Sequence, residues 1–318
     1  ELGNTYTAEE MNDKAISTFD NLINNNKNSA YVAKSILKQG LIYYNTDKDD
    51  AAITKFKKVV AEFPNSPESL EAVATAKSIY KANGKVGEYA AWVKTLSFVE
   101  VTDAELDNDM YESAEKQYLN NSPKKAIEGF TSYLAQFPNG LHALKVHFYL
   151  AQLYFADKLE KNAIPHYDYV IAQARNEFTE QALVRLSEIH LKDKNCELAI
   201  SVLKQVETIA EFPQNTTFAQ ANLMKCYYEK QDFVNSEIYA DKVLKNPKMD
   251  DKIKSDAQII IARSAIKTNN DAKAKEAYAK LQKIAKGELA AEALYYDAYF
   301  KNKEAKFEAS NKAVEKYS

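Results

Sequence analysis

Four histidines, His142, His147, His166 and His190, are the residues of this chain that could hold a metal ion or transfer protons. Zinc-binding helices place two histidines four residues apart, so that both rings lie on one face. His142 and His147 are five residues apart, and no His-Glu-x-x-His motif occurs in the sequence. We therefore expect no metal site, and we expect His190 to be a partly buried packing residue.

The two cysteines, Cys196 and Cys226, could form a disulfide or act as nucleophiles. A disulfide requires their Cα atoms to lie within about 7 Å, which the sequence leaves open. Neither cysteine has the surrounding residues that mark a catalytic cysteine. The favoured interpretation is two small apolar thiols inside helices, with the disulfide as the alternative.

Four acidic residues alternate in the connector between positions 103 and 109, which suggests a calcium loop. An EF-hand loop needs Gly at its sixth position and Glu at its twelfth, but Asn108 and Ala114 stand there. We expect instead a helix N-terminus, where the helix dipole stabilises carboxylates.

Glycine motifs of nucleotide-binding and hydrolytic enzymes are also missing from the sequence. Neither G-x-x-x-x-G-K-[ST], G-x-S-x-G nor G-x-G-x-x-G occurs, and Asn83-Gly84-Lys85 reads as a turn. We therefore expect no cofactor, no catalytic residues and no enzymatic activity.

The composition indicates the fold class. The chain has 318 residues, 46% of them hydrophobic, but only 7 Gly and 7 Pro. Sheets and barrels need many turn residues, so this composition favours helices joined by short connections. No run of 18 apolar residues exists, so no membrane-spanning helix is expected. A net charge of −3 and only three arginines argue against a nucleic-acid partner.

A position that usually holds a small residue recurs every 36 to 38 residues along the chain. It stands at Ala15, Ala52, Tyr89, Ala126, Ala163, Ala199, Ser236, Ala274 and Ser310. Twelve residues before each stands a second, generally small residue: Gly3, Gly40, Lys77, Ala114, Ala151, Ser187, Met224, Ala262 and Ala298. Each period predicts two antiparallel helices that approach closely at these two positions. No single pair can bury its apolar face alone, so the pairs are expected to stack.

Gly40, Tyr43, Ala52, Phe56 and Pro64 stand at the spacings of the tetratricopeptide repeat signature. The chain resembles this family over essentially its whole length. The resemblance implies an all-α fold, a right-handed superhelical solenoid of about nine antiparallel helix pairs that occupies residues 1–318 as one domain.

The expected repeats have approximate boundaries set by the period. They are 1–28, 29–67, 68–102, 103–140, 141–176, 177–213, 214–249, 250–287 and 288–318. The first is expected to be incomplete at its N-terminus. The third departs most from the pattern, because Lys77 and Tyr89 replace its small residues, so we expect altered packing there. We expect the chain to be a piece of a longer array, or to have an end covered by another chain, for example by self-association through uncapped ends.

The resemblance also implies where a partner binds, because the first helices of tetratricopeptide repeats line the concave face. Inner positions lie three residues before, one after and four after the small residue of the first helix. The residues predicted to contact a partner are Tyr44, Tyr111, Glu115, Tyr118, Phe148, Gln152, Phe155, Tyr228, Arg263 and Tyr299. An alternative is that such rings are buried between neighbouring helices.

The predicted function is a scaffold that binds a partner protein or peptide. The segments Phe63–Pro67 (Phe-Pro-Asn-Ser-Pro) and Phe137–Gly140 (Phe-Pro-Asn-Gly) resemble connectors in bacterial cell-envelope tetratricopeptide proteins. This resemblance implies a periplasmic or outer-membrane-associated location, with the cytoplasm as the alternative. Two other functions stay open: a spacer within a longer multi-repeat protein and, less favoured, a helical-repeat nucleic-acid binder.

Overall fold

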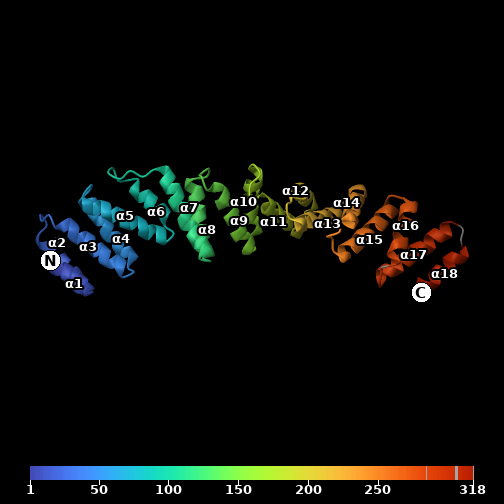
Figure 1. Ribbon diagram of the computed structural model, residues 1–318, viewed down its shortest axis with the longest axis horizontal. Coiled ribbons are helices and arrows are strands. Elements are labelled where there is room, and N and C mark those ends of the chain that lie inside the picture. Colours follow the sequence, from blue (N-terminus) through green and yellow to red (C-terminus); the bar gives the residue numbers. More distant parts are fainter. Residues whose placement is uncertain (284, 305–306, 318) are drawn as a thin grey trace. The chain divides into compact units, whose positions relative to one another are not determined.

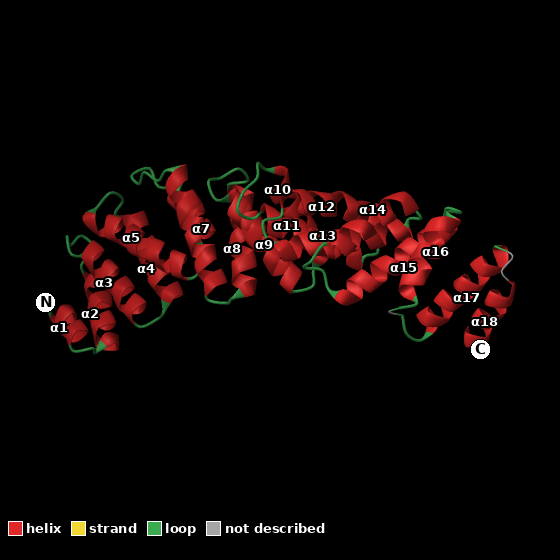
Figure 2. Cartoon of the chain, turned by 45° about the vertical axis from the view of Figure 1, so that its right-hand side comes forward, coloured by secondary structure: helices red, strands yellow, loops and turns green. Residues whose placement is uncertain are grey.

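The computed structural model describes residues 1–283, 285–304 and 307–317, and its regular structure in these ranges is entirely α-helical (Figures 1 and 2). The prediction of an all-α fold is confirmed. The helices are α1 (Leu2–Ala8), α2 (Asn12–Asn25), α3 (Val32–Asn45), α4 (Asp49–Glu62), α5 (Pro67–Ala82), α6 (Val86–Val93), α7 (Asp103–Leu119), α8 (Pro123–Gln136), α9 (Ala143–Ala156), α10 (Glu160–Ala172), α11 (Thr179–Lys192), α12 (Cys196–Ile209), α13 (Pro213–Glu229), α14 (Phe233–Lys245), α15 (Asp251–Lys267), α16 (Asp271–Leu281), α17 (Glu288–Lys303) and α18 (Phe307–Tyr317).

The chain divides into two compact units, Glu1–Asp157 and Lys158–Ser318. The N-terminal unit contains α1 to α9, and the C-terminal unit contains α10 to α18. Within each unit, every helix packs against the next helix in the sequence. The boundary between the units falls between α9 and α10, inside the expected repeat 141–176.

Left-handed residues end eight of the first helices that the structure describes. They are Glu10, Asp47, Gly84, Asn121, Lys158, Lys194, Gln231 and Asn269, each with positive φ. After α3, the Asp47 N–H donates to the Tyr44 carbonyl at 3.2 Å, and the Lys48 N–H donates to the Tyr43 carbonyl at 2.9 Å. This is the Schellman arrangement that closes a helix end. Its recurrence gives successive helix pairs the same turn, although only one of the eight residues is glycine.

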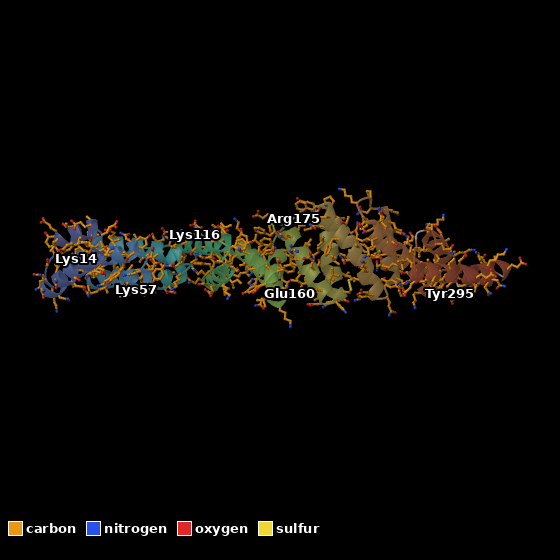
Figure 3. The ribbon with its side chains drawn as sticks, turned by 90° about the horizontal axis from the view of Figure 1, so that it is seen from below. Lys14, Lys57, Lys116, Glu160, Arg175 and Tyr295 are labelled. Carbon is orange, nitrogen blue, oxygen red and sulfur yellow. A yellow bond between two sulfur atoms is a disulfide. The ribbon has the colours of Figure 1, made fainter. Side chains whose placement is uncertain are left out.

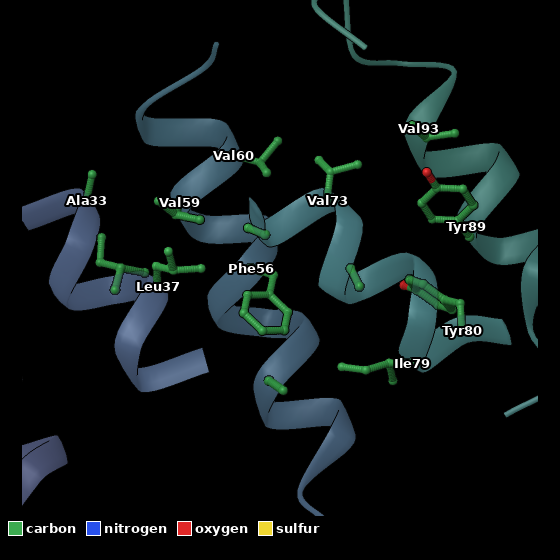
Figure 4. Packing of buried hydrophobic residues seen from close by; sticks show 14 of the residues in the cluster. Ala33, Leu37, Phe56, Val59, Val60, Val73, Ile79, Tyr80, Tyr89 and Val93 are labelled. Carbon is green, nitrogen blue, oxygen red and sulfur yellow. The ribbon is translucent and has the colours of Figure 1, made fainter. Parts of the chain in front are cut away.

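Close approach within a pair explains the small residues at the repeating positions. A Cβ atom on Gly40 of α3 would lie 2.5 Å from Cε1 of Phe56 on α4, whose ring is fully buried. Figure 4 shows Phe56 in a buried cluster with Leu37 and Ile79. Where serine replaces alanine, as at Ser236, the hydroxyl donates to the carbonyl of the paired residue, Met224, at 3.1 Å.

The third repeat departs from its neighbours, as the sequence predicts. Its second helix, α6, has only 8 residues. Tyr89 fills the position of the small residue, and its buried ring lies 6.2 Å from the ring of Tyr80 and 6.3 Å from that of Trp92. Lys77 instead forms an ion pair of 2.6 Å with Asp109 on α7. A bulky ring and a charged side chain thus replace the close contact of two small residues.

Candidate partner-binding site

The ten predicted partner-binding residues all lie on first helices, but only six of them lie on neighbouring first helices. Six lie on α7 and α9 of the N-terminal unit: Tyr111, Glu115, Tyr118, Phe148, Gln152 and Phe155. Tyr44 lies apart from these on α3, where it is exposed. The other three, Tyr228, Arg263 and Tyr299, lie on separate helices of the C-terminal unit. Only α7 and α9 therefore bring several of these residues together.

An open hollow lies beside the C-terminal ends of α7 and α9. It has a volume of about 490 Å³, and its lining is mostly apolar: Tyr118, Leu119, Asn121, Pro123, Gln152, Leu153 and Ala156. Leu119 is 73% exposed, so it offers apolar surface at the edge of the hollow. Two of the predicted residues, Tyr118 and Gln152, are part of this lining.

Tyr118 is held in place by other aromatic rings. Its ring stacks on that of Tyr149, with centroids 4.7 Å apart and planes 19° apart, and it lies 6.4 Å from the ring of Phe130. Phe130 is fully buried, so the stack is anchored in the core. A ring fixed in this way loses little conformational entropy when a partner packs on it.

Gln152 carries a polar atom whose bonding is incomplete. Its Nε2 atom is buried and has no hydrogen-bond acceptor. A buried donor without an acceptor costs about 1–3 kcal/mol. A hydrogen-bond acceptor that reached this amide, such as a main-chain carbonyl, would therefore be bound favourably.

Tyr111 and Phe148 contribute little surface of their own. Their side chains are only 4% and 7% exposed, so both residues lie in the core and not on the surface of α7 and α9. The Tyr111 hydroxyl donates to Oε1 of Glu115, and its ring stacks on His142 at a centroid distance of 4.0 Å. Burial, and then the bond to Glu115, raise the pKa of Tyr111. These contacts keep the hydroxyl protonated and the ring fixed as a support.

Asp107 is a positioning residue that the sequence does not reveal. Its Oδ1 accepts a hydrogen bond of 2.6 Å from the Tyr133 hydroxyl, and its Oδ2 accepts one of 2.9 Å from the Leu141 N–H. The His142 N–H donates to the same Tyr133 oxygen at 3.0 Å. The carboxylate thereby ties α7 to α8 and to the loop that leads into α9. It fixes how the two helices of the hollow meet.

The predicted helix N-terminus near position 103 is present, but two of its four acidic residues have other roles. Thr102 and Glu105 form a capping box at the start of α7. Asp107 and Asp109 lie further along the helix and are buried. Burial opposes ionisation of Asp109, but its bonds to Lys77 and Lys81 hold its pKa below the ordinary value. The segment is thus helix rather than connector.

Glu180 repeats the role of Asp107 in the C-terminal unit. Both residues stand seven positions before the small residue of their first helix. Glu180 accepts hydrogen bonds from the N–H groups of Glu211 and Phe212, at 2.9 and 3.3 Å, in the loop before α13. An acidic residue at this register is the signal that could have identified both loop anchors from the sequence.

The predicted residues of the C-terminal unit do not form one site. Arg263 makes two hydrogen bonds to Glu292, of 2.9 and 2.5 Å, so its guanidinium is already paired. Tyr228 packs edge-on against Phe233. Tyr299 is exposed beside Tyr295, which is 54% exposed and labelled in Figure 3. These three side chains thus have separate neighbours on three different helices.

The structure corrects the favoured interpretation of the cysteines. Cys196 and Cys226 form a disulfide, with Cα atoms 5.2 Å apart. The antiparallel packing of α12 and α13 brings the two residues together across 30 positions of sequence. Helix periodicity alone does not report that distance.

Metal-ligand clusters, the environment of His190 and membrane-spanning helices are the remaining points on which the described residues bear. In ranges 1–283, 285–304 and 307–317, no three His, Cys, Asp or Glu side chains are grouped as a metal site. His190 is buried, and desolvation lowers its pKa, as expected for a packing residue. Among the helices described, none has both the length and the apolarity to cross a bilayer.

Paired antiparallel helices with small residues at a fixed period define a helical repeat protein. Residues 34–66 match the family model of the tetratricopeptide repeat. The same pairing, spacing and turn recur along the chain, so helix pairs outside residues 34–66 are similar to those of the tetratricopeptide repeat. A sequence search of curated proteins finds no match.

Solved structures that resemble the chain have low sequence identity to it. One is described as PilW, a widely conserved type IV pilus biogenesis factor, and it is 15% identical to this chain. The match covers 82% of this chain and 98% of PilW, with a TM-score of 0.35. The Pseudomonas aeruginosa pilF protein is 14% identical, with 69% and 94% covered and a TM-score of 0.32. The C-terminal part of a tetratricopeptide protein from Cytophaga hutchinsonii is 15% identical, with 80% and 98% covered and a TM-score of 0.38.

Proposed function

We propose that this protein is a non-catalytic scaffold that binds an extended segment of a partner protein in the hollow at the ends of α7 and α9. The observation that carries the proposal is the combination in one hollow of a fixed aromatic ring, Tyr118, an exposed apolar side chain, Leu119, and an unpaired amide donor, Gln152. An apolar anchor beside a hydrogen-bonding group is typical of sites that recognise peptides.

Each group of the hollow has a defined task in this proposal. The partner's apolar side chain packs on Tyr118 and Leu119, which removes apolar surface from water. A main-chain carbonyl of the partner accepts a hydrogen bond from Gln152 after rotation of its amide. Stacked helix pairs present such groups along a surface, whereas catalysis would need a convergent set of reactive side chains.

We further propose that the protein works outside the cytoplasm, in the bacterial cell envelope. The Cys196–Cys226 disulfide supports this location, because disulfides persist in oxidising compartments and are rare in the cytosol. Alkylation of thiols in intact cells before lysis tests the location. A disulfide found in the native protein supports it, and two free thiols contradict it.

A displayed library of random linear peptides tests binding in the hollow. We expect enriched peptides to share an apolar residue and to lose at least about tenfold in affinity for the variants Tyr118→Ala and Leu119→Ser, a loss of about 1.4 kcal/mol. Tyr31→Ala is a matched control, because Tyr31 is an exposed tyrosine outside the hollow. Fluorescence anisotropy measures each affinity, and circular dichroism checks that the variants are folded.

The same experiment separates the scaffold from the spacer role. If no peptide is enriched, the proposed peptide site is wrong and a spacer in a longer protein becomes the favoured function. If enriched peptides bind Tyr118→Ala as well as the unmodified chain, binding occurs elsewhere on the protein and the hollow is not the site.

A further inference from the structure

The disulfide closes a helical hairpin at its open end. Cys196 is the first residue of α12, and Cys226 lies in the last turn of α13. The loop from 210 to 212 joins the other ends of these two helices. Because α12 belongs to the repeat 177–213 and α13 to the repeat 214–249, the bond links consecutive repeats covalently.

The two sulfur atoms differ in access. Cys226 is 2% exposed, whereas Cys196 is 9% exposed and borders an open hollow of about 520 Å³. A reducing thiolate can therefore reach Cys196 more readily than Cys226. The lining of the hollow carries three acidic and two basic side chains: it consists of Asp193, Lys194, Asn195, Cys196, Glu197, Glu229 and Lys230.

Glu229 lies directly beside the disulfide bond. Its Oε2 atom lies 3.3 Å from Sγ of Cys196. Lys230 forms an ion pair with Glu197, so that lysine is already neutralised. An attacking thiolate therefore meets the carboxylate of Glu229 at Cys196, the more accessible of the two sulfur atoms.

Attack at the accessible sulfur, Cys196, is slowed by its poor leaving group. Attack at Cys196 forms a new S–S bond there and breaks the Cys196–Cys226 bond, so Cys226 must leave as a thiolate. That thiolate would lie buried in the last turn of α13, where desolvation and the negative end of the dipole both destabilise it. A thiolate on Cys196 would be stabilised by the N-terminus of α12, but its release requires attack on the buried Cys226. Exchange rates fall when the leaving thiolate is poor.

We propose that the Cys196–Cys226 disulfide is a lasting cross-link between the two repeats, protected from thiol exchange by Glu229 and by the burial of Cys226. Complete reduction needs a dithiol reductant: its first thiolate forms the mixed disulfide at Cys196, and its second closes its own disulfide and releases Cys196. The reductant loses two electrons, and the two protein thiolates take up protons from solvent. The inference concerns a different part of the molecule from the proposed peptide site and does not depend on it.

Reduction kinetics of the folded full chain test the role of Glu229. The chain is treated with dithiothreitol, and free thiols are alkylated with a mass tag at successive times. At low salt we expect Glu229→Gln to be reduced about fivefold faster, the effect of removing a repulsion of about 1 kcal/mol. At 1 M salt we expect most of this gain to vanish. Glu177→Gln is the matched control, because Glu177 is an exposed glutamate near the opposite end of α11 from this hollow.

Equal rates for Glu229→Gln and the unmodified chain would overturn the protective role of the carboxylate. A second measurement tests access with single-cysteine variants. The thiol of Cys196 in the Cys226→Ser chain should react with an aromatic disulfide reagent at least about tenfold faster than that of Cys226 in the Cys196→Ser chain, since access controls exchange. Comparable rates in variants that are folded by circular dichroism would refute the asymmetry, and a faster Cys226 would reverse the proposed direction of attack.

Discussion

Replacement of Asp107 by alanine should loosen the joint that ties α7 to α8 and to the loop before α9, and so the orientation of the two helices whose C-terminal ends border the proposed binding hollow. The change removes the acceptor of two hydrogen bonds, one from the Tyr133 hydroxyl at 2.6 Å and one from the Leu141 N–H at 2.9 Å. Tyr133 is fully buried, so its hydroxyl gains no water in exchange. Hydrogen bonds to charged groups contribute about 1.5–3 kcal/mol each, but removal of the buried charge offsets part of the loss. We expect a net destabilisation of about 3 kcal/mol.

Two measurements report this loss at different levels. Denaturant unfolding, followed by fluorescence of the single tryptophan, Trp92 on α6, reports the stability of the N-terminal unit. Hydrogen exchange reports the loop directly: the Leu141 amide should exchange roughly a hundredfold faster, since about 3 kcal/mol corresponds to that change in the opening equilibrium. Affinity for peptides selected by the hollow should fall as well.

Controls separate a specific anchor from a general effect of charge. Asp103 is an exposed acidic residue on the same helix with an ion pair of 3.2 Å to Lys94, and Asp103→Ala should cost less than about 1 kcal/mol. Tyr133→Phe shares one hydrogen bond with Asp107→Ala, so the double variant should be less damaging than the sum of the two. If Asp107→Ala costs no more than Asp103→Ala, or if Leu141 exchange is unchanged, the reasoning about the anchor is refuted.

Three further predictions concern the turns, the disulfide and acid stability. Gln231 has a φ of 59°, a backbone conformation that glycine adopts more easily, so Gln231→Gly should raise the unfolding free energy by about 0.5–1 kcal/mol. Gly84 has a φ of 75°, so Gly84→Ala should lower the unfolding free energy for the same reason. Thermal unfolding measures both changes. The double change Cys196→Ser/Cys226→Ser should cost about 3–4 kcal/mol for a closed loop of 30 residues, and a denaturation midpoint equal to that of the oxidised chain would contradict this. Burial opposes the charge of Glu180, but its hydrogen bonds prevail and lower its pKa from the ordinary 4.5. The contribution of ionised Glu180 to the free energy of unfolding is therefore complete above pH 4.5 and is lost as the pH falls through the lower pKa of the folded state. Glu180→Gln should flatten the pH dependence of the melting temperature in this window.

The repeat and its helices could be predicted from the sequence because they depend on local and periodic properties. Gly40 and Ala52 are small since two helices touch there, and a Cβ on Gly40 would meet the ring of Phe56. A similar contact occurs at Gly3, where a Cβ would meet the ring of Phe19, so similar residue sizes recur in the sequence. The irregular third repeat could be predicted for the same reason, since Lys77 and Tyr89 interrupt the pattern and α6 is short.

Only the tertiary structure decided which inner residues are surface and which are support. Tyr111 and Tyr118 stand seven residues apart on one stripe of α7, yet Tyr111 is buried under His142 and Tyr118 borders the hollow. Helix periodicity fixes the direction of a side chain relative to its own axis. Exposure depends on the neighbouring helix and loop that cover it, and these come from another repeat.

The anchor at Asp107 and the Cys196–Cys226 disulfide show the same division. Each joins residues about 30 positions apart, and each requires an approach of a few ångströms between separate helices. The sequence determined that this protein is a stack of helix pairs, because apolar period and residue size act within a repeat. The packing of one repeat on the next determined where a loop is anchored, where two sulfur atoms meet and where the proposed binding hollow lies.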